Sequence, residues 1–192
     1  TTRAVSVGID YSAHGLWRGS SKLELRSSGD VAGTPENEAF RTSLWQISVA
    51  RKLDRDWTFL ARNYLLKTDY SARGDVAQDR LQVGVAYRDT DTNRVNALAK
   101  YEYKTERDDS NPAVGTLSSV AHIVSVHADW HPSRPWWTTA RLAAKWQNDQ
   151  FERGLRDSFR AQLVSGRLIY DVTENWDVGL TGAVQFGQHA AR

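Results

Sequence analysis

The sequence of 192 residues contains no cysteine and no long apolar run. The absence of cysteine excludes disulfides, thiolate metal sites and a cysteine nucleophile. A membrane-spanning helix requires about 20 consecutive apolar residues, and no stretch approaches that length, which excludes a helical membrane protein. A large excess of charge of one sign is also lacking, because 25 basic and 23 acidic residues give a net charge of +2. So balanced a composition does not indicate a nucleic-acid partner.

No signal peptide opens the chain, which begins Thr1-Thr2-Arg3 and enters an alternating pattern directly. The sequence is therefore expected to be a mature protein or a piece of one. Its length suits one domain, and no shift in composition marks a second, so we expect a single domain over residues 1–192.

The stretch from Arg167 to Phe186 shows the repeated unit of the chain most clearly. An alternating run ends at Tyr170, a polar turn is expected at 171–175, and a second run begins at Trp176. Side chains of a strand alternate between two faces. One face of the second run is therefore apolar, with Val178, Leu180, Gly182, Val184 and Phe186, and the other is polar or small.

The same unit recurs along the whole chain and predicts ten strands of roughly 9 to 11 residues, the length of a tilted membrane-crossing strand. Short turns alternate strictly with long polar loops, and the loops are expected at 27–39, 67–78, 105–116 and 148–157. The fourth strand, expected at 57–66, is the least regular. Arg62 shares its parity with Leu60 and Tyr64, whereas Asn63 shares its parity with Phe59 and Leu65, and a β-bulge would resolve the conflict.

Aromatic side chains gather beside the short turns. Amphipathic rings collect at the boundary between apolar and aqueous surroundings, and the residues expected at a membrane interface are Tyr11, Trp17, Trp57, Tyr87, Trp130, Trp136, Tyr170 and Trp176. Alternating short and long connections are typical of outer-membrane barrels. The pattern predicts an all-β fold, an antiparallel up-and-down transmembrane β-barrel, in preference to a soluble β-barrel or sandwich.

Across nearly its full length the chain resembles the transmembrane β-barrel of Gram-negative outer-membrane proteins. Three stretches, Val49 to Trp57, VAYRDTDTNRVNALAKYEY and VSGRLIYDVTENWDVGL, are also similar to the C-terminal barrel segment of large multidomain bacterial surface proteins. The resemblance implies a location in the bacterial outer membrane with outer-membrane lipid as a partner. Further strands or domains of the same chain, or other subunits, are candidate partners.

Two departures from such barrels concern the ends of the chain. Outer-membrane barrels usually end in a strand with a terminal aromatic residue, whereas this chain continues past Phe186 to Arg192. If the short turns face the periplasm, both ends of the chain also lie on the outer side. We therefore expect a fragment of a barrel of 12 or more strands, with at least one strand before Thr1 and an odd number after Arg192.

The polar face would line the lumen of such a barrel. The expected lumen set is Arg18, Lys22, Glu24, Arg26, Arg80, Arg88, Lys100, Glu102, Lys104, His127, Asp129, Arg141, Lys145, Arg167 and Asp177. Opposite charges of the set are expected to pair across neighbouring strands. Basic residues outnumber acidic ones, and rings of Arg or Lys favour anions. The sequence therefore predicts a pore or translocation unit with a mildly basic lumen. The alternatives are a membrane anchor for a large surface-exposed or periplasmic domain, and a soluble β-barrel binding module.

Catalysis is not expected. Ser125, His127 and Asp129 are the residue types of a hydrolytic triad, but successive positions on one face of a strand lie ~6.5 to 7 Å apart. Their expected role is that of polar lumen residues. No glycine-rich phosphate loop and no zinc pattern is present, so no cofactor or metal is predicted.

Overall fold

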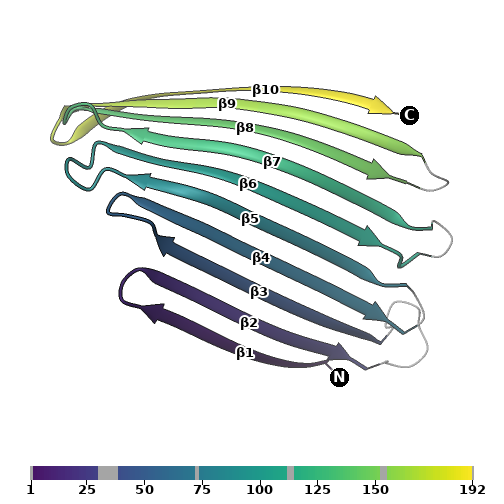
Figure 1. Cartoon of the computed structure of the whole chain (residues 1–192). Coiled ribbons are helices and arrows are strands. Elements are labelled where there is room, and N and C mark those ends of the chain that lie inside the picture. Colours follow the sequence, from purple (N-terminus) through teal and green to yellow (C-terminus); the bar gives the residue numbers. More distant parts are fainter. Residues whose placement is uncertain (1, 30–38, 72–73, 112–114, 152–154, 192) are drawn as a thin grey trace.

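The computed structural model describes residues 2–29, 39–71, 74–111, 115–151 and 155–191. These residues form ten strands, β1 (Thr2–Ala13), β2 (Trp17–Ser28), β3 (Phe40–Lys52), β4 (Trp57–Tyr70), β5 (Val76–Arg88), β6 (Val95–Asp108), β7 (Leu117–Trp130), β8 (Trp136–Gln150), β9 (Arg156–Thr173) and β10 (Trp176–Ala191). The strands lie in one sheet in sequence order, each antiparallel to the next (Figure 1). The predicted all-β, up-and-down antiparallel architecture is confirmed. In the described ranges, no helix has the length and apolar character needed to cross a membrane.

The strands are longer than the sequence predicted, with 12 residues in β1 and 18 in β9. All four of the expected loops are correspondingly shorter, because β2 continues to Ser28, β4 to Tyr70, β6 to Asp108 and β8 to Gln150. Pairing persists in these polar extensions, as where Arg107 lies opposite Ala77. The turn expected at 171–175 is also shorter, since β9 continues to Thr173, and the register shifts between Trp176 and Asp177.

The β-bulge expected in β4 is absent, because β4 pairs with β3 and with β5 without a register shift. Arg62 lies opposite Ser48 and Gln82, and Asn63 lies opposite Ile47 and Leu81. The conflicting parity therefore has a simpler origin: Asn63 lies among apolar residues on one face, and Leu60 and Tyr64 lie with Arg62 on the polar face. In the described part of the chain the Asn63 Oδ1 atom is buried without a hydrogen-bond partner.

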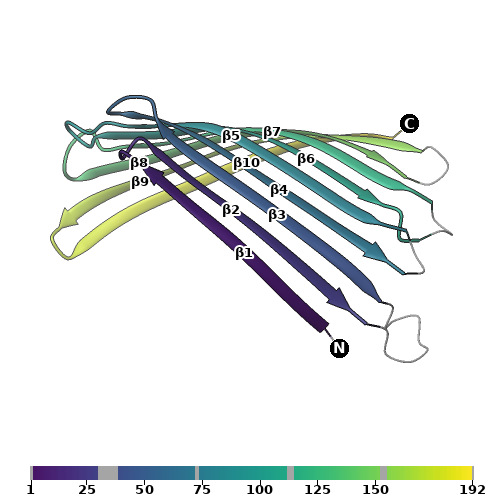
Figure 2. The same ribbon diagram turned by 60° about the horizontal axis from the view of Figure 1, so that its bottom comes forward.

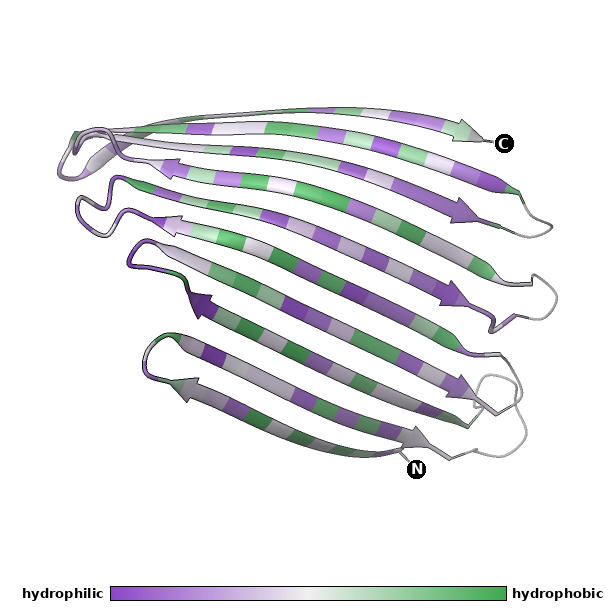
Figure 3. Cartoon of the chain, viewed as in Figure 1, coloured by the Kyte–Doolittle hydropathy of each residue, from purple (hydrophilic) through white to green (hydrophobic). Residues whose placement is uncertain are grey.

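The register sorts the side chains into an apolar face and a polar face. Val7 lies opposite Leu23, Leu23 opposite Trp45 and Trp45 opposite Leu65, so apolar residues continue from strand to strand. The neighbouring positions, such as Lys22 opposite Gln46, carry polar residues across the same strands. Figure 3 shows the result as alternating hydrophobic and hydrophilic bands along the strands.

The sheet has almost no buried apolar interior. Ala121 is the one hydrophobic residue that is fully buried in the described ranges, whereas Ile9 is 67% exposed and Leu180 is 74% exposed. The accessible surface is 13807 Å². A folded soluble monomer of this mass is expected to expose about 9,200 Å². The excess of accessible surface arises because no other part of the described chain packs against the apolar face.

Backbone hydrogen bonds join each short turn to the next, and we call this row of contacts the turn belt. In every contact a carbonyl beside one turn accepts from an N–H beside the following turn, with the pairs Leu16 and Lys52 at 2.8 Å, Asp56 and Arg88 at 2.9 Å, Arg94 and His131 at 2.7 Å, and Pro135 and Asp171 at 2.8 Å. The turn belt fixes the relative height of successive hairpins at this end of the sheet.

The two edges of the sheet are open. β1 pairs with β2 alone and β10 pairs with β9 alone among the described strands. The start of β1 and the end of β10 both lie at the end of the sheet that carries the long connections (Figure 1). A turned view shows that the sheet is twisted and curved across its width (Figure 2).

Candidate pore-lining face

Every residue of the expected lumen set lies on the polar face. Glu102 sits opposite Gln82, Arg141 opposite His127, and Arg167 opposite both Thr139 and Thr181. The period-two pattern of each strand therefore placed these side chains correctly relative to one another. Their contact with a pore remains a prediction.

Glu102 is the most enclosed charged group of this face, with 3% of the residue exposed. The Nε atom of Arg80 donates to Oε1 at 2.7 Å, and the Nε2 atom of Gln82 donates to Oε2 at 2.7 Å. Lys100 Nζ lies 3.4 Å from Oε2. Both carboxylate oxygens are therefore bonded and the charge is compensated, which burial of an ionised group requires.

Glu24, 8% exposed, has a similar arrangement. Lys22 Nζ lies 2.9 Å from its Oε2 atom, and the Nε atom of Arg26 donates to Oε1. Both cations come from β2 itself, two positions before and two after Glu24, and not from a neighbouring strand as expected. Each glutamate of the lumen set is thus neutralised by two basic residues.

Other cations of the polar face have no carboxylate partner within the part of the chain that the structure describes. They are Arg18, Lys52, Arg62, Arg88, Arg141, Lys145 and Arg167, none of which takes part in an ion pair. Arg62 is a residue that sequence analysis missed, because the parity of β4 could not be assigned. Its position opposite Gln82, a clear polar-face residue, is the signal that assigns it.

Several acids of the polar face were also missed, because the strands extend farther than expected. Asp149 and Asp157 lie opposite each other beside the long connection between β8 and β9. Glu106 and Asp108 lie at the same end of β6. The basic residues without an ion pair thus lie in the middle of the strands and toward the short turns, away from these acids.

The Ser125, His127 and Asp129 set is only partly assembled. His127 Nε2 lies 3.5 Å from Asp129 Oδ2, and Thr139 Oγ1 donates to Asp129 Oδ1 at 2.8 Å. Within the described residues no hydrogen bond joins Ser125 to His127, so the serine has no base in contact. The described part of the chain contains no cluster of three or more His, Asp or Glu placed to hold a metal ion.

The aromatic residues expected at a membrane interface share the apolar face and the short-turn end. Trp57 and Tyr87 have ring centroids 4.9 Å apart, and Trp136 and Tyr170 are 4.6 Å apart. Trp176 is 74% exposed. Each contact joins two rings of neighbouring strands beside the short turns.

A second aromatic group lies nearer the other end of the apolar face. The hydroxyl of Tyr101 and His122 Nδ1 are 2.8 Å apart, and the ring of Tyr103 lies 5.3 Å from that of His122. Trp146 lies opposite His122 on β8. His122 had not been assigned any role from the sequence.

No family model and no curated protein matches the sequence. Among solved structures, the chain is similar to one described as "NanC porin structure in rhombohedral crystal form". The identity is 10% and the TM-score 0.32, and the match covers 100% of this chain and 93% of that chain.

Proposed function

We propose that this chain forms the wall of a β-barrel pore in a Gram-negative outer membrane. The observation that carries the proposal is the continuous exposed apolar face opposite a charged face over ten strands. Exposed apolar patches on soluble monomers rarely exceed a few hundred Å². A soluble binding module would leave this face in water, whereas a bilayer covers it.

The dimensions of the apolar face suit a bilayer. In β10 the apolar run from Val178 to Phe186 is all exposed. Eight residue steps at about 3.3 Å, reduced by a tilt of about 40°, give a height of about 20 Å. This approaches the ~25 Å apolar band of membrane barrels.

The stagger of the strands suits a barrel. Tyr11 lies beside the first short turn, and following the paired residues from strand to strand leads from Tyr11 to Phe186 in β10. Phe186 lies eight residues beyond Val178, which is beside the last short turn. The shift is eight residues over nine strand pairs, or ~2.9 Å for each strand spacing of ~4.8 Å. That slope corresponds to a tilt of about 30°, close to the 35 to 45° of membrane barrels. In a bilayer the free N–H and C=O groups of β1 and β10 also require partners, which closure of the sheet supplies.

The charge of the polar face supports a preference for anions. Glu24 and Glu102 are neutralised locally, whereas Arg62, Arg141 and Arg167 have no carboxylate partner in the described residues. Unpaired guanidinium groups in a water-filled lumen attract anions and repel cations.

Reversal-potential measurements in planar bilayers under a salt gradient test the pore. We expect stepwise conductance with a higher permeability to chloride than to potassium. We expect the Arg141→Gln variant to have a chloride-to-potassium permeability ratio closer to one. Arg51→Gln is the matched control, because Arg51 lies on the apolar face over the ring of Trp17. Cation selectivity would contradict the anion preference. Insertion without conductance would contradict the pore and favour a membrane anchor with a plugged lumen.

A further inference from the structure

A hollow on the polar face, bordered by β1 to β6, has a volume of about 590 Å³. Drug-sized ligands occupy pockets of about 300 to 1,000 Å³. The register arranges the polar-face residues of the hollow in two adjacent rows. One row runs through Asp10, Ser20, Ser48, Arg62 and Gln82, and the other runs through Ser12, Arg18, Ala50, Leu60, Gly84 and Lys100.

Small residues between long ones create the hollow. Ser20 and Ser48 bond to each other at 2.6 Å and fill little space. Gly84 has no room for a larger residue, since a Cβ atom there would lie 2.9 Å from the carbonyl oxygen of Ala99. Leu60, Ala50 and Leu98 give the floor an apolar surface.

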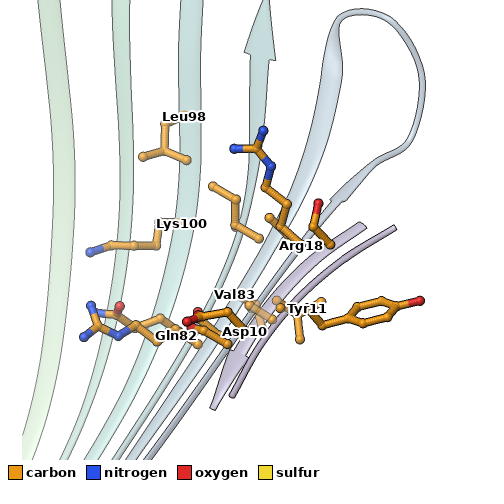
Figure 4. A pocket seen from close by; sticks show the side chains of 17 residues that line it. Asp10, Tyr11, Arg18, Gln82, Val83, Leu98 and Lys100 are labelled. Carbon is orange, nitrogen blue, oxygen red and sulfur yellow. The ribbon is translucent and has the colours of Figure 1, made fainter. Parts of the chain in front are cut away.

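Three cations surround this apolar floor. Arg18 and Arg62 have no ion pair in the described ranges, and Lys100 has only the 3.4 Å contact with Glu102. Arg18 and Arg62 are two strands and one row apart, as are Arg62 and Lys100, which corresponds to about 12 Å between the backbone positions of each pair. Figure 4 shows Arg18 and Lys100 coming from different strands while Tyr11 points away. Asp10 is the one carboxylate lining the hollow.

We propose that this hollow binds small organic anions that carry an apolar body, such as aromatic carboxylates. The inference rests on the membrane orientation in the proposed function, because the hollow must face water and not lipid, whether or not the lumen conducts ions. The spacing of the cations explains the preference. A compact inorganic anion contacts one cation and leaves the floor uncovered, whereas an aromatic carboxylate covers Leu60 and Leu98 while its carboxylate reaches Arg62 or Arg18.

Equilibrium binding of 2-naphthoate to the protein folded in lipid nanodiscs, measured by calorimetry, tests the site. We expect saturable binding that is at least tenfold tighter than that of 2-naphthalenemethanol, which lacks the charge, or of sulfate, which lacks the apolar body. Arg62→Gln is expected to weaken 2-naphthoate binding about tenfold. Arg134→Gln, the same change in the turn between β7 and β8, is expected to change it less than twofold.

A second pair of variants tests the shape of the hollow without a change of charge. Ala50→Phe fills the floor and is expected to abolish binding. Ala143→Phe is the matched control, since Ala143 lies in the same row of the polar face on β8, outside the hollow. Equal affinity for 2-naphthoate and 2-naphthalenemethanol, or unchanged binding in Ala50→Phe, would overturn the proposal.

Conductance of the same preparations separates the two proposals. A wild-type protein that conducts ions but does not bind 2-naphthoate contradicts the binding site alone. A protein that binds 2-naphthoate and loses binding in Ala50→Phe, but never conducts, contradicts the pore and retains the site.

Discussion

At the scale of single residues, the polar face separates compensated charges from free ones. Glu102 has partners for both oxygens, and its side chain is only 4% exposed. Glu106, on the same face of β6, pairs with Lys104 at 2.8 Å but has 38% of its side chain exposed. The two glutamates therefore differ in what their loss leaves behind. Removal of Glu102 leaves Arg80, Gln82 and Lys100 without an acceptor.

Glu102→Gln is expected to lower the free energy of unfolding by about 1 to 3 kcal/mol, because the enclosed acceptor of these three donors loses its charge. Urea unfolding of the protein refolded in lipid vesicles measures the change. Glu106→Gln, the control, is expected to cost less than about 0.5 kcal/mol, as for exposed ion pairs. Equal decreases in the free energy of unfolding in the two variants would show that the cluster around Glu102 stabilises the protein no more than an exposed ion pair.

At the scale of elements, the turn belt extends the pairing between neighbouring hairpins up to the short turns. In the turn between β5 and β6, Asp89 accepts hydrogen bonds from the side chain and backbone of Thr92, and these lower the pKa of Asp89 to about 2. In the preceding turn, hydrogen bonds from Thr90 lower the pKa of Asp56. Both carboxylates thus favour the folded turns when they are ionised.

The contribution of Asp89 to stability is expected to depend on pH. Its pKa is lower in the folded protein than its ordinary value of 3.8, so the stabilisation is complete above about pH 4 to 5 and is lost as the pH falls toward 2. Asp89→Ala should therefore lower the urea midpoint at pH 7, and the difference from wild type should shrink between pH 4 and pH 2.

The Glu174→Ala variant is the control for the turn experiment. Glu174 lies in the turn between β9 and β10, and its side chain has no hydrogen bond or ion pair in the described residues. Its urea midpoint should follow that of wild type at every pH. A decrease in urea midpoint in Asp89→Ala that stayed constant from pH 7 to pH 2 would contradict the stabilising role of the ionised Asp89 carboxylate.

At the scale of the whole molecule, the sequence alone predicted the two faces but not their details. Alternation placed Lys100 and Arg141 correctly because it depends only on the local strand. It did not place Arg62, because Asn63 interrupts the apolar pattern of β4. It also missed the strand beyond Leu66 and Lys104, since paired polar extensions resemble loops in sequence.

Contacts between strands were beyond sequence reasoning for a related physical reason. The bond from Arg80 to Glu102 and the hollow beside Arg62 depend on the register, and a shift of two residues would keep every side chain on its face while changing its partners. The turn belt depends on backbone atoms, which carry no sequence signal. The faces were therefore predictable, and the sites on them required the structure.

The most direct test of the membrane-spanning sheet uses single cysteines in this cysteine-free chain. Ser125→Cys and Val126→Cys are neighbours on opposite faces of β7, and Ala143→Cys and Leu142→Cys form the same pair on β8. In lipid vesicles, we expect fast reaction of a membrane-impermeant maleimide at 125 and 143 and protection at 126 and 142. Equal reactivity on both faces, or protection at 125 and 143 alone, would contradict the membrane-spanning sheet.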